Sequence, residues 1–171
     1  TATRRVYAHS SVLDAFRERL LTRIAGAKVG DPSDPETEVG PVVNEGSLDE
    51  ILAAVARGVS DGGTVLSGGA QQGDEIVATE VFGPVTSLFS FETLDEALQR
   101  ANAVEFGLSA AIYTRDLHAV QRFANELQAG ILHVNSQTAG ADVHVPFGGL
   151  KGSAWGPHEQ GRAAMEFYTE T

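Results

Sequence analysis

The fold of this chain is decided by residues 85–135, which read VTSLFSFETLDEALQRANAVEFGLSAAIYTRDLHAVQRFANELQAGILHVN. Apolar runs with the length of β-strands alternate in this stretch with amphipathic runs that are long enough for helices. We predict strands at 85–91, 108–113 and 130–135 and helices at 93–103 and 116–127. Such alternation is typical of βαβ units, in which right-handed crossovers join parallel strands. We therefore predict an α/β fold with an open, mostly parallel twisted sheet and flanking helices.

Both helices of this stretch begin at residues that favour helix starts. Thr93 and Glu96 have the spacing of a capping box, and Asp116 can accept a hydrogen bond from a first-turn amide. Ligands of open α/β sheets gather outside the carboxyl ends of the strands. The loop from Asn135 to Phe147 follows the third strand, so we expect it at a functional edge of the sheet.

Shorter elements are expected on either side of this stretch. We predict strands at 6–8 and 64–66, helices at about 12–24, 47–59 and 157–165, and an extended tail at 167–171. The first helix opens with Ser11-Val-Leu-Asp14, which is similar to a capping box. One buried helix face is predicted from Val12, Phe16, Leu20 and Ile24. Pro157 suits the first position of the last helix. No internal boundary is visible, so residues 1–171 are expected to form one domain.

The composition excludes several classes of function. The chain has 171 residues, a formal net charge of −11 and a pI of about 4.7, which argue against nucleic acid and anionic membranes as partners. There is no apolar run of transmembrane length and no secretory signal pattern, and we expect a cytoplasmic protein. The absence of cysteine excludes disulfides and a cysteine nucleophile within these residues. The five histidines lack a compact metal-binding spacing, so no metal site is expected.

Two segments carry chemistry that the fold alone does not explain. Glu80-Val-Phe-Gly-Pro-Val85 sets a carboxylate, an aromatic ring and a Gly-Pro stop directly before a buried strand. Such a carboxylate is unfavourable unless something uses it, although a plain turn entering a strand is the simpler reading. The glycines of 148–156 form neither a P-loop nor a Rossmann fingerprint, because their spacing and context differ from both. They indicate a surface loop with tight turns.

Three segments together resemble the aldehyde dehydrogenase superfamily. They are Thr1-Ala-Thr-Arg-Arg-Val-Tyr7, Glu80-Val-Phe-Gly-Pro-Val85, and Val134-Asn135 with Pro146-Phe-Gly-Gly-Leu-Lys-Gly-Ser153. The resemblance covers nearly the whole chain and implies that residues 1–171 are the C-terminal part of the catalytic domain. The nucleophilic cysteine of the family would lie just before Thr1, so no catalytic residue is expected within the chain. The dinucleotide-binding domain, the glutamate base and the oxyanion asparagine would also lie upstream.

The resemblance also implies roles for individual residues. Glu80 would hydrogen-bond the nicotinamide ribose hydroxyls of NAD or NADP, and Phe82 would lie against the nicotinamide. Asn135 resembles the asparagine that braces the active site, and Glu159 resembles a late carboxylate of the same region. The implied substrate pocket comprises Asn135, Ser136, Gln137, Thr138 and Phe147.

The end of the chain resembles one branch of the family. His144-Val-Pro-Phe-Gly-Gly149 and the segments 156–162 and 166–169 are similar to enzymes that oxidise 2-oxoglutarate semialdehyde (2,5-dioxopentanoate). The resemblance implies NAD(P)-dependent oxidation of an aldehyde to a carboxylic acid by the parent enzyme. An anionic substrate would favour a cation in the pocket, and the candidates are Arg4, Arg5 and Lys151.

Three alternatives remain open. The chain can be a non-catalytic fragment, because it has no cysteine. It can be an interaction module, because 167–171 resembles the start of an oligomerisation tail that extends a partner's sheet in homodimers or homotetramers. It can be a relative that acts on an acyl phosphate, although Glu80–Val85 fits aldehyde dehydrogenases better. The stretch from Gly69 to Glu80 is shorter than in the family, which leaves open whether residues are missing there and before Thr1.

Overall fold

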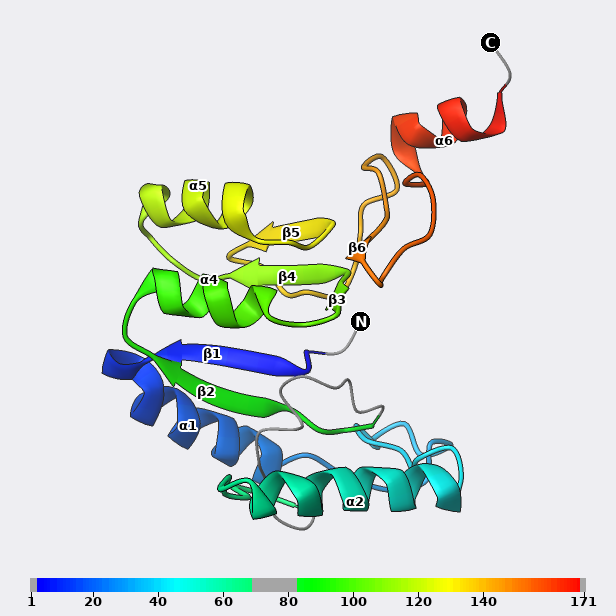
Figure 1. Ribbon diagram of the computed structural model, residues 1–171. Helices are drawn as coiled ribbons and strands as arrows, with labels where there is room; N and C mark the ends of the chain where they lie inside the picture. Colours follow the sequence, from blue (N-terminus) through cyan, green and yellow to red (C-terminus); the bar gives the residue numbers. More distant parts are fainter. Residues whose placement is uncertain (1–2, 69–82, 170–171) are drawn as a thin grey trace. The chain divides into compact units, whose positions relative to one another are not determined.

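The computed structural model describes residues 3–68 and 83–169. The chain divides into two compact units, one comprising Arg4–Glu92 and the other Thr1–Thr3 with Thr93–Thr171. Each unit contains a pair of parallel strands with flanking helices (Figure 1). The α/β class is therefore confirmed. Within the described residues the strands form two-stranded sheets rather than one larger sheet, and the chain has two compact units where the sequence showed no boundary.

The first strand pair joins two distant segments of the Arg4–Glu92 unit. β1 (Arg5–His9) and β2 (Ser87–Phe91) run parallel, with Arg5 opposite Ser87. The rings of Tyr7 and Phe89 pack with their centroids 5.4 Å apart, because directly paired residues share a face of the sheet. The strands predicted at 6–8 and 85–91 are confirmed, the second beginning two residues later than expected.

The core of this unit forms on α2 (Glu45–Ser60), which begins after the capping residue Asn44. Ile51 and Val55 lie about one turn apart, so they share a helix face, and both are buried. Val42, Val65 and Val85 pack against them. Gly83 packs closely on this face, because a Cβ there would lie only 2.3 Å from Cδ1 of Ile51. The Gly-Pro end of the segment 80–85 is thus held against α2.

The prediction for the first helix is wrong in two respects. α1 (Ser10–Ala25) is capped by His9, whose Nδ1 accepts a hydrogen bond from the Ser11 amide, so the helix does not start with the box at Ser11. The predicted buried face is largely uncovered, since Val12, Phe16 and Ile24 are 54%, 38% and 44% exposed. α1 packs on β1 and β2, and this narrow sheet covers only part of the apolar side of the helix.

The other unit follows the predicted alternation closely. α4 (Leu94–Asn102) and α5 (Leu117–Glu126) accompany the parallel strands β4 (Ser109–Ile112) and β5 (Ile131–Val134). The helix starts are as expected, because the side chains of Thr93 and Asp116 accept hydrogen bonds from the first-turn amides. Leu98 of α4 and Phe123 of α5 are each 5% exposed. The two helices contact each other, and Arg122 of α5 forms an ion pair with Asp95 of α4 at 2.5 Å.

The C-terminal part of this unit differs from the prediction. β3 (Phe106–Gly107) pairs antiparallel with β6 (Leu150–Lys151), and α6 (Gly161–Tyr168) begins four residues after Pro157. The backbone of Glu159 is paired with Phe147, so the chain cannot be helical before that bridge ends. The extended tail predicted from residue 167 is also wrong at its start, because Phe167 and Tyr168 belong to α6.

Three features are absent from the described residues. Residues 64–66 do not form the strand that their apolar pattern suggested. No helix in the described part is long and apolar enough to cross a membrane. Among residues 3–68 and 83–169 there is also no cluster of three or more potential metal-binding side chains.

Candidate functional site

The carboxyl ends of β4 and β5 are tied together by Asn135. Its backbone amide donates to the Ile112 carbonyl at 2.8 Å. Its side-chain oxygen accepts from the Thr114 amide at 2.9 Å, and its side-chain nitrogen donates to the Thr114 carbonyl at 3.0 Å. Asn135 has a φ of +54°, a left-handed conformation that asparagine tolerates better than most residues. The side chain therefore ties the end of β5 to Thr114, which follows β4.

The loop after Asn135 turns back along β4. Ser136 and Gln137 are exposed, whereas Thr138 is half-buried. The carbonyl of Thr138 accepts a hydrogen bond from the hydroxyl of Ser109 at 2.9 Å. Ser109 is the first residue of β4, so the loop leaves the carboxyl edge of the strands within three residues. The expectation that the whole loop lies at that edge is correct for Asn135 but not for Thr138.

Thr138 also contacts the start of the chain. The hydroxyl oxygens of Thr138 and Thr3 lie 3.1 Å apart and share a hydrogen bond. Thr3 and the predicted pocket loop are therefore neighbours within one compact unit. The sequence did not predict Thr3 and Ser109 as partners of this loop, because a single hydroxyl carries no local signal for contacts over 135 and 29 positions.

Phe147 lies where the glycine loop meets the approach to α6. It is half-buried, and its backbone pairs with Glu159 through hydrogen bonds of 2.6 and 2.8 Å. This bridge brings the two predicted residues together by their backbones, while the Glu159 side chain is exposed.

The glycines beside Phe147 are required by close packing. A Cβ on Gly148 would lie 2.3 Å from the ring of His158, and one on Gly130 would lie 1.9 Å from the Gly148 carbonyl oxygen. Gly148 thus fits between an imidazole ring and the residue that precedes β5. The tight turns predicted for this loop serve packing of the loop against β5.

Lys151 has a role other than the pocket cation suggested by the sequence. Its Nζ donates to the carbonyls of Asn102 at 2.6 Å and Val104 at 3.2 Å, at the carboxyl end of α4. A cation is favourable at a helix C-terminus, where unpaired carbonyls carry partial negative charge. Lys151 itself has a left-handed backbone conformation, with a φ of +54°.

Other predicted site residues belong to the Arg4–Glu92 unit. The predictions for Glu80 and Phe82 lie outside the described residues. Just after them, the Gly83 carbonyl accepts a hydrogen bond from the guanidinium of Arg4, and the carbonyl of Arg4 in turn accepts one from the Ser87 amide at 2.9 Å. Arg4 therefore joins the start of the chain to the end of the segment 80–85.

The shifted pKa values of the Thr93–Thr171 unit belong to its helices rather than to these loops. Hydrogen bonding from Arg122 lowers the pKa of Glu126, and bonding to Glu126 and Asp95 raises the pKa of Arg122. In the other unit, hydrogen bonds to Asp34 and then Glu36 raise the pKa of Lys28. These groups stabilise surface ion pairs and do not form an acid–base site.

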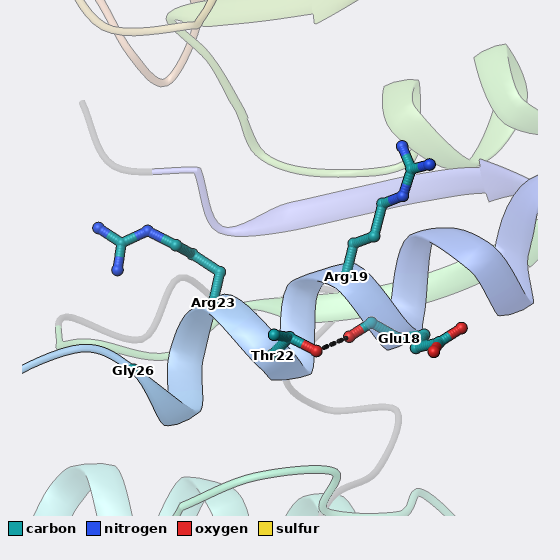
Figure 2. Close-up of a pocket in the computed structure, with 5 residues that line it drawn as sticks. All are labelled: Glu18, Arg19, Thr22, Arg23 and Gly26. Carbon is teal, nitrogen blue, oxygen red and sulfur yellow. Dashed lines mark hydrogen bonds between the residues drawn. The ribbon is translucent and has the colours of Figure 1, made fainter.

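A shallow surface hollow lies on α1 (Figure 2). It is lined by Glu18, Arg19, Thr22, Arg23 and Gly26. The Thr22 hydroxyl donates to the Glu18 carbonyl at 2.9 Å, which is an ordinary bond within a helix. The hollow therefore offers no arrangement of nucleophile and base.

Comparison with known proteins adds independent findings. The statistical model of the "Aldehyde dehydrogenase family" matches residues 1–171. "Alpha-ketoglutaric semialdehyde dehydrogenase" of Bacillus subtilis (strain 168) is 33% identical over 190 residues, covering 99% of this chain and 39% of the relative. A "Betaine aldehyde dehydrogenase" of Cereibacter sphaeroides (strain KD131) is 37% identical over 183 residues, covering 97% of this chain and 38% of the relative.

Solved structures agree with these relatives. A putative aldehyde dehydrogenase from Burkholderia cenocepacia superposes with a TM-score of 0.88 at 34% identity, covering 97% of this chain and 38% of that chain. Betaine aldehyde dehydrogenase from Staphylococcus aureus in complex with NAD+ superposes with a TM-score of 0.85 at 30% identity, covering 96% and 36%. The chain thus spans about two fifths of the length of these proteins. It belongs to the aldehyde dehydrogenase family.

Proposed function

We propose that this chain is the C-terminal part of the catalytic domain of an enzyme that oxidises an aldehyde to a carboxylic acid with NAD or NADP. The observation that carries the proposal is the bond between Thr3 and Thr138. It sets the predicted pocket loop against the segment that, by the family resemblance, directly follows the nucleophilic cysteine. The match of the family to residues 1–171 supports the same assignment.

The residues of this chain would shape the pocket rather than supply the nucleophile. Asn135 holds the strand ends that start the loop, and Thr138 fixes its middle. Phe147 is anchored by its bridge to Glu159 and offers an apolar wall. A pocket built on anchored backbone can hold the aldehyde carbon in a narrow range of positions, which is a large source of rate acceleration.

Glu80 and Phe82 would hold the nicotinamide half of the cofactor. A carboxylate is a suitable acceptor for the two ribose hydroxyls, and an aromatic ring is a suitable surface for the nicotinamide. When bound, the cofactor supplies the hydride acceptor for the oxidation. Arg4 and Ile51 contact Gly83, the residue that follows Phe82. The relative from Staphylococcus aureus that was solved with NAD+ supports a nicotinamide cofactor.

For the substrate we propose 2,5-dioxopentanoate, which is 2-oxoglutarate semialdehyde. The similarity to the Bacillus subtilis semialdehyde dehydrogenase supports an anionic aldehyde, and the betaine aldehyde relatives suggest a cationic one as the competitor. The carboxylate of 2,5-dioxopentanoate would not be bound by Lys151, which is engaged at the end of α4.

The test is to measure NADH and NADPH formation by the encoded full-length protein with both aldehydes. We expect a higher kcat/KM for 2,5-dioxopentanoate than for betaine aldehyde. A reversed preference would refute the substrate, and no turnover of any aldehyde would refute the enzyme. A comparison of NAD with NADP at saturating aldehyde would identify the cofactor.

A second role, in subunit assembly, is favoured by the surface of α6. Met165 and Tyr168 are 62% and 73% exposed although both are large and apolar in part. We propose that this region joins subunits in a homodimer or homotetramer of the parent enzyme. Light scattering of the full-length protein tests this, and a monomer at high concentration would refute it. Because the chain contains no cysteine, we also expect the 171 residues alone to form no NADH from any aldehyde.

A further inference from the structure

Three hydroxyl-bearing residues from distant parts of the sequence meet at one point of the Thr93–Thr171 unit, to which Thr3 also belongs. Ser109 donates through its hydroxyl to the carbonyl of Thr138, and the hydroxyl of Thr138 shares a hydrogen bond with that of Thr3. Ser109 and Thr138 are half-buried, and Thr3 is exposed. We define these three residues as the hydroxyl clamp.

The clamp restrains the loop in two directions. The Ser109 bond holds the backbone of Thr138 against the first residue of β4, which is itself fixed by pairing opposite Ile131 of β5. With the backbone held, the Thr138 side chain has few positions left, and one of them meets Thr3. The bond to Thr3 therefore links the position of the strand pair to Thr3.

The bond between Thr3 and Thr138 would join two parts of the active site. This step rests on the proposed function, by which the loop lines the aldehyde pocket and Thr3 lies a few residues after the nucleophile. A misplacement of about 1 Å between reacting groups can slow an enzyme about a hundredfold. Geometry of this kind must be held by neighbouring groups rather than by the reacting groups alone.

We propose that Thr3 is a positioning residue, which acts through Thr138 to fix the distance between the nucleophile segment and the pocket loop. It does not touch the reacting atoms. Loss of the clamp would leave aldehyde binding nearly intact but reduce the fraction of bound substrate that is correctly placed. The expected signature is a fall in kcat with little change in KM.

The experiment uses the encoded full-length protein with the variants Thr3→Val, Thr138→Val and the double variant. Valine keeps the branched shape and removes the hydroxyl. We expect each single variant to lower kcat about tenfold, while KM changes less than about twofold. The double variant should be no slower than about twice the worse single variant, because both remove the same bond.

Two comparisons separate positioning from a general loss of structure. Thr3→Ser keeps the hydroxyl and should restore kcat to within about twofold of the wild type. Thr22→Val removes a hydroxyl of the same kind from α1, where it bonds only the preceding turn, and should keep wild-type kcat. The proposal is overturned if the valine variants keep wild-type kcat, if Thr3→Ser is as slow as Thr3→Val, or if Thr22→Val is equally slow.

The test also distinguishes this inference from the proposed function. A wild-type protein that turns over aldehydes alongside unaffected valine variants overturns only the clamp. A wild-type protein that turns over no aldehyde overturns the proposed function. In that case the hydroxyl clamp is still tested by hydrogen exchange of the amides of residues 136–140. An unchanged exchange rate in Thr3→Val overturns the clamp.

Discussion

The brace formed by Asn135 gives a prediction that can be measured at a single amide. The Thr114 amide donates to the Asn135 side-chain oxygen at 2.9 Å, and the Asn135 side-chain nitrogen donates back to Thr114 at 3.0 Å. Asn135→Ala removes both bonds. Each contributes about 0.5–1.5 kcal/mol, and because Asn135 is exposed we take the lower half of that range. The two bonds together then contribute about 1–2 kcal/mol.

The backbone adds a second term to the same substitution. Asn135 has a φ of +54°, and alanine is destabilised there by about 1 kcal/mol relative to glycine. The expected local destabilisation is about 2–3 kcal/mol for Asn135→Ala and about 1–2 kcal/mol for Asn135→Gly. Asn135→Asp keeps the acceptor for the Thr114 amide and loses the donor to the Thr114 carbonyl.

The assay is native-state hydrogen exchange of the Thr114 amide. A loss of 2–3 kcal/mol corresponds to exchange that is faster by about 30- to 150-fold in Asn135→Ala, if local opening limits exchange. Asn135→Gly should be intermediate, and Asn135→Asp should retain most of the protection. The reasoning is refuted if Thr114 exchanges at the wild-type rate in Asn135→Ala, or if glycine and alanine are equal.

Two further predictions concern packing and pH. Gly148→Ala should lower the free energy of unfolding by about 1–3 kcal/mol, because its Cβ would lie 2.3 Å from the His158 ring. Chemical denaturation measures this loss, and adding His158→Ala should recover part of it. Equal stability of Gly148→Ala and the wild type would contradict the predicted clash. Arg122 lowers the pKa of Glu126 from its ordinary value of 4.5, so the stability that Glu126 contributes is present above that value and is lost as the pH falls through its lower folded-state pKa. Unfolding followed at falling pH should therefore show a shallower acid loss in Glu126→Gln than in the wild type, and identical acid profiles would argue against this ion pair.

Elements with local signals were predictable from the sequence, and elements that depend on distant partners were not. Thr93 and Asp116 cap helices within their own next turn, so composition and spacing were enough. The apolar residues of α1 recur with helical spacing in the sequence, but this spacing does not show whether another surface covers them. Phe16 consequently stays 38% exposed beside a sheet of only two strands.

The same distinction explains the outcome at the candidate site. The place of Asn135 followed from the rule that loops after parallel strands carry function. The contact of Thr138 with Thr3 spans 135 positions and depends on how the loop turns back along β4, which no local pattern records. The late start of α6 has a similar cause, because the Phe147–Glu159 bridge holds the backbone extended where Pro157 alone would allow a helix.

The register of the two strand pairs has a consequence for the order of events during synthesis. Ser109 pairs with Ile131, 22 positions later, whereas Arg5 pairs with Ser87, 82 positions later. At about 5–20 residues per second, β1 would wait roughly 4–16 s on the ribosome for its partner, against about 1–4 s for β4. During that time β1 would lack the strand that pairs with it, and α1 would lack one of the two strands on which it packs. The nascent chain is therefore most exposed to chaperones and to misassembly before β2 has been made.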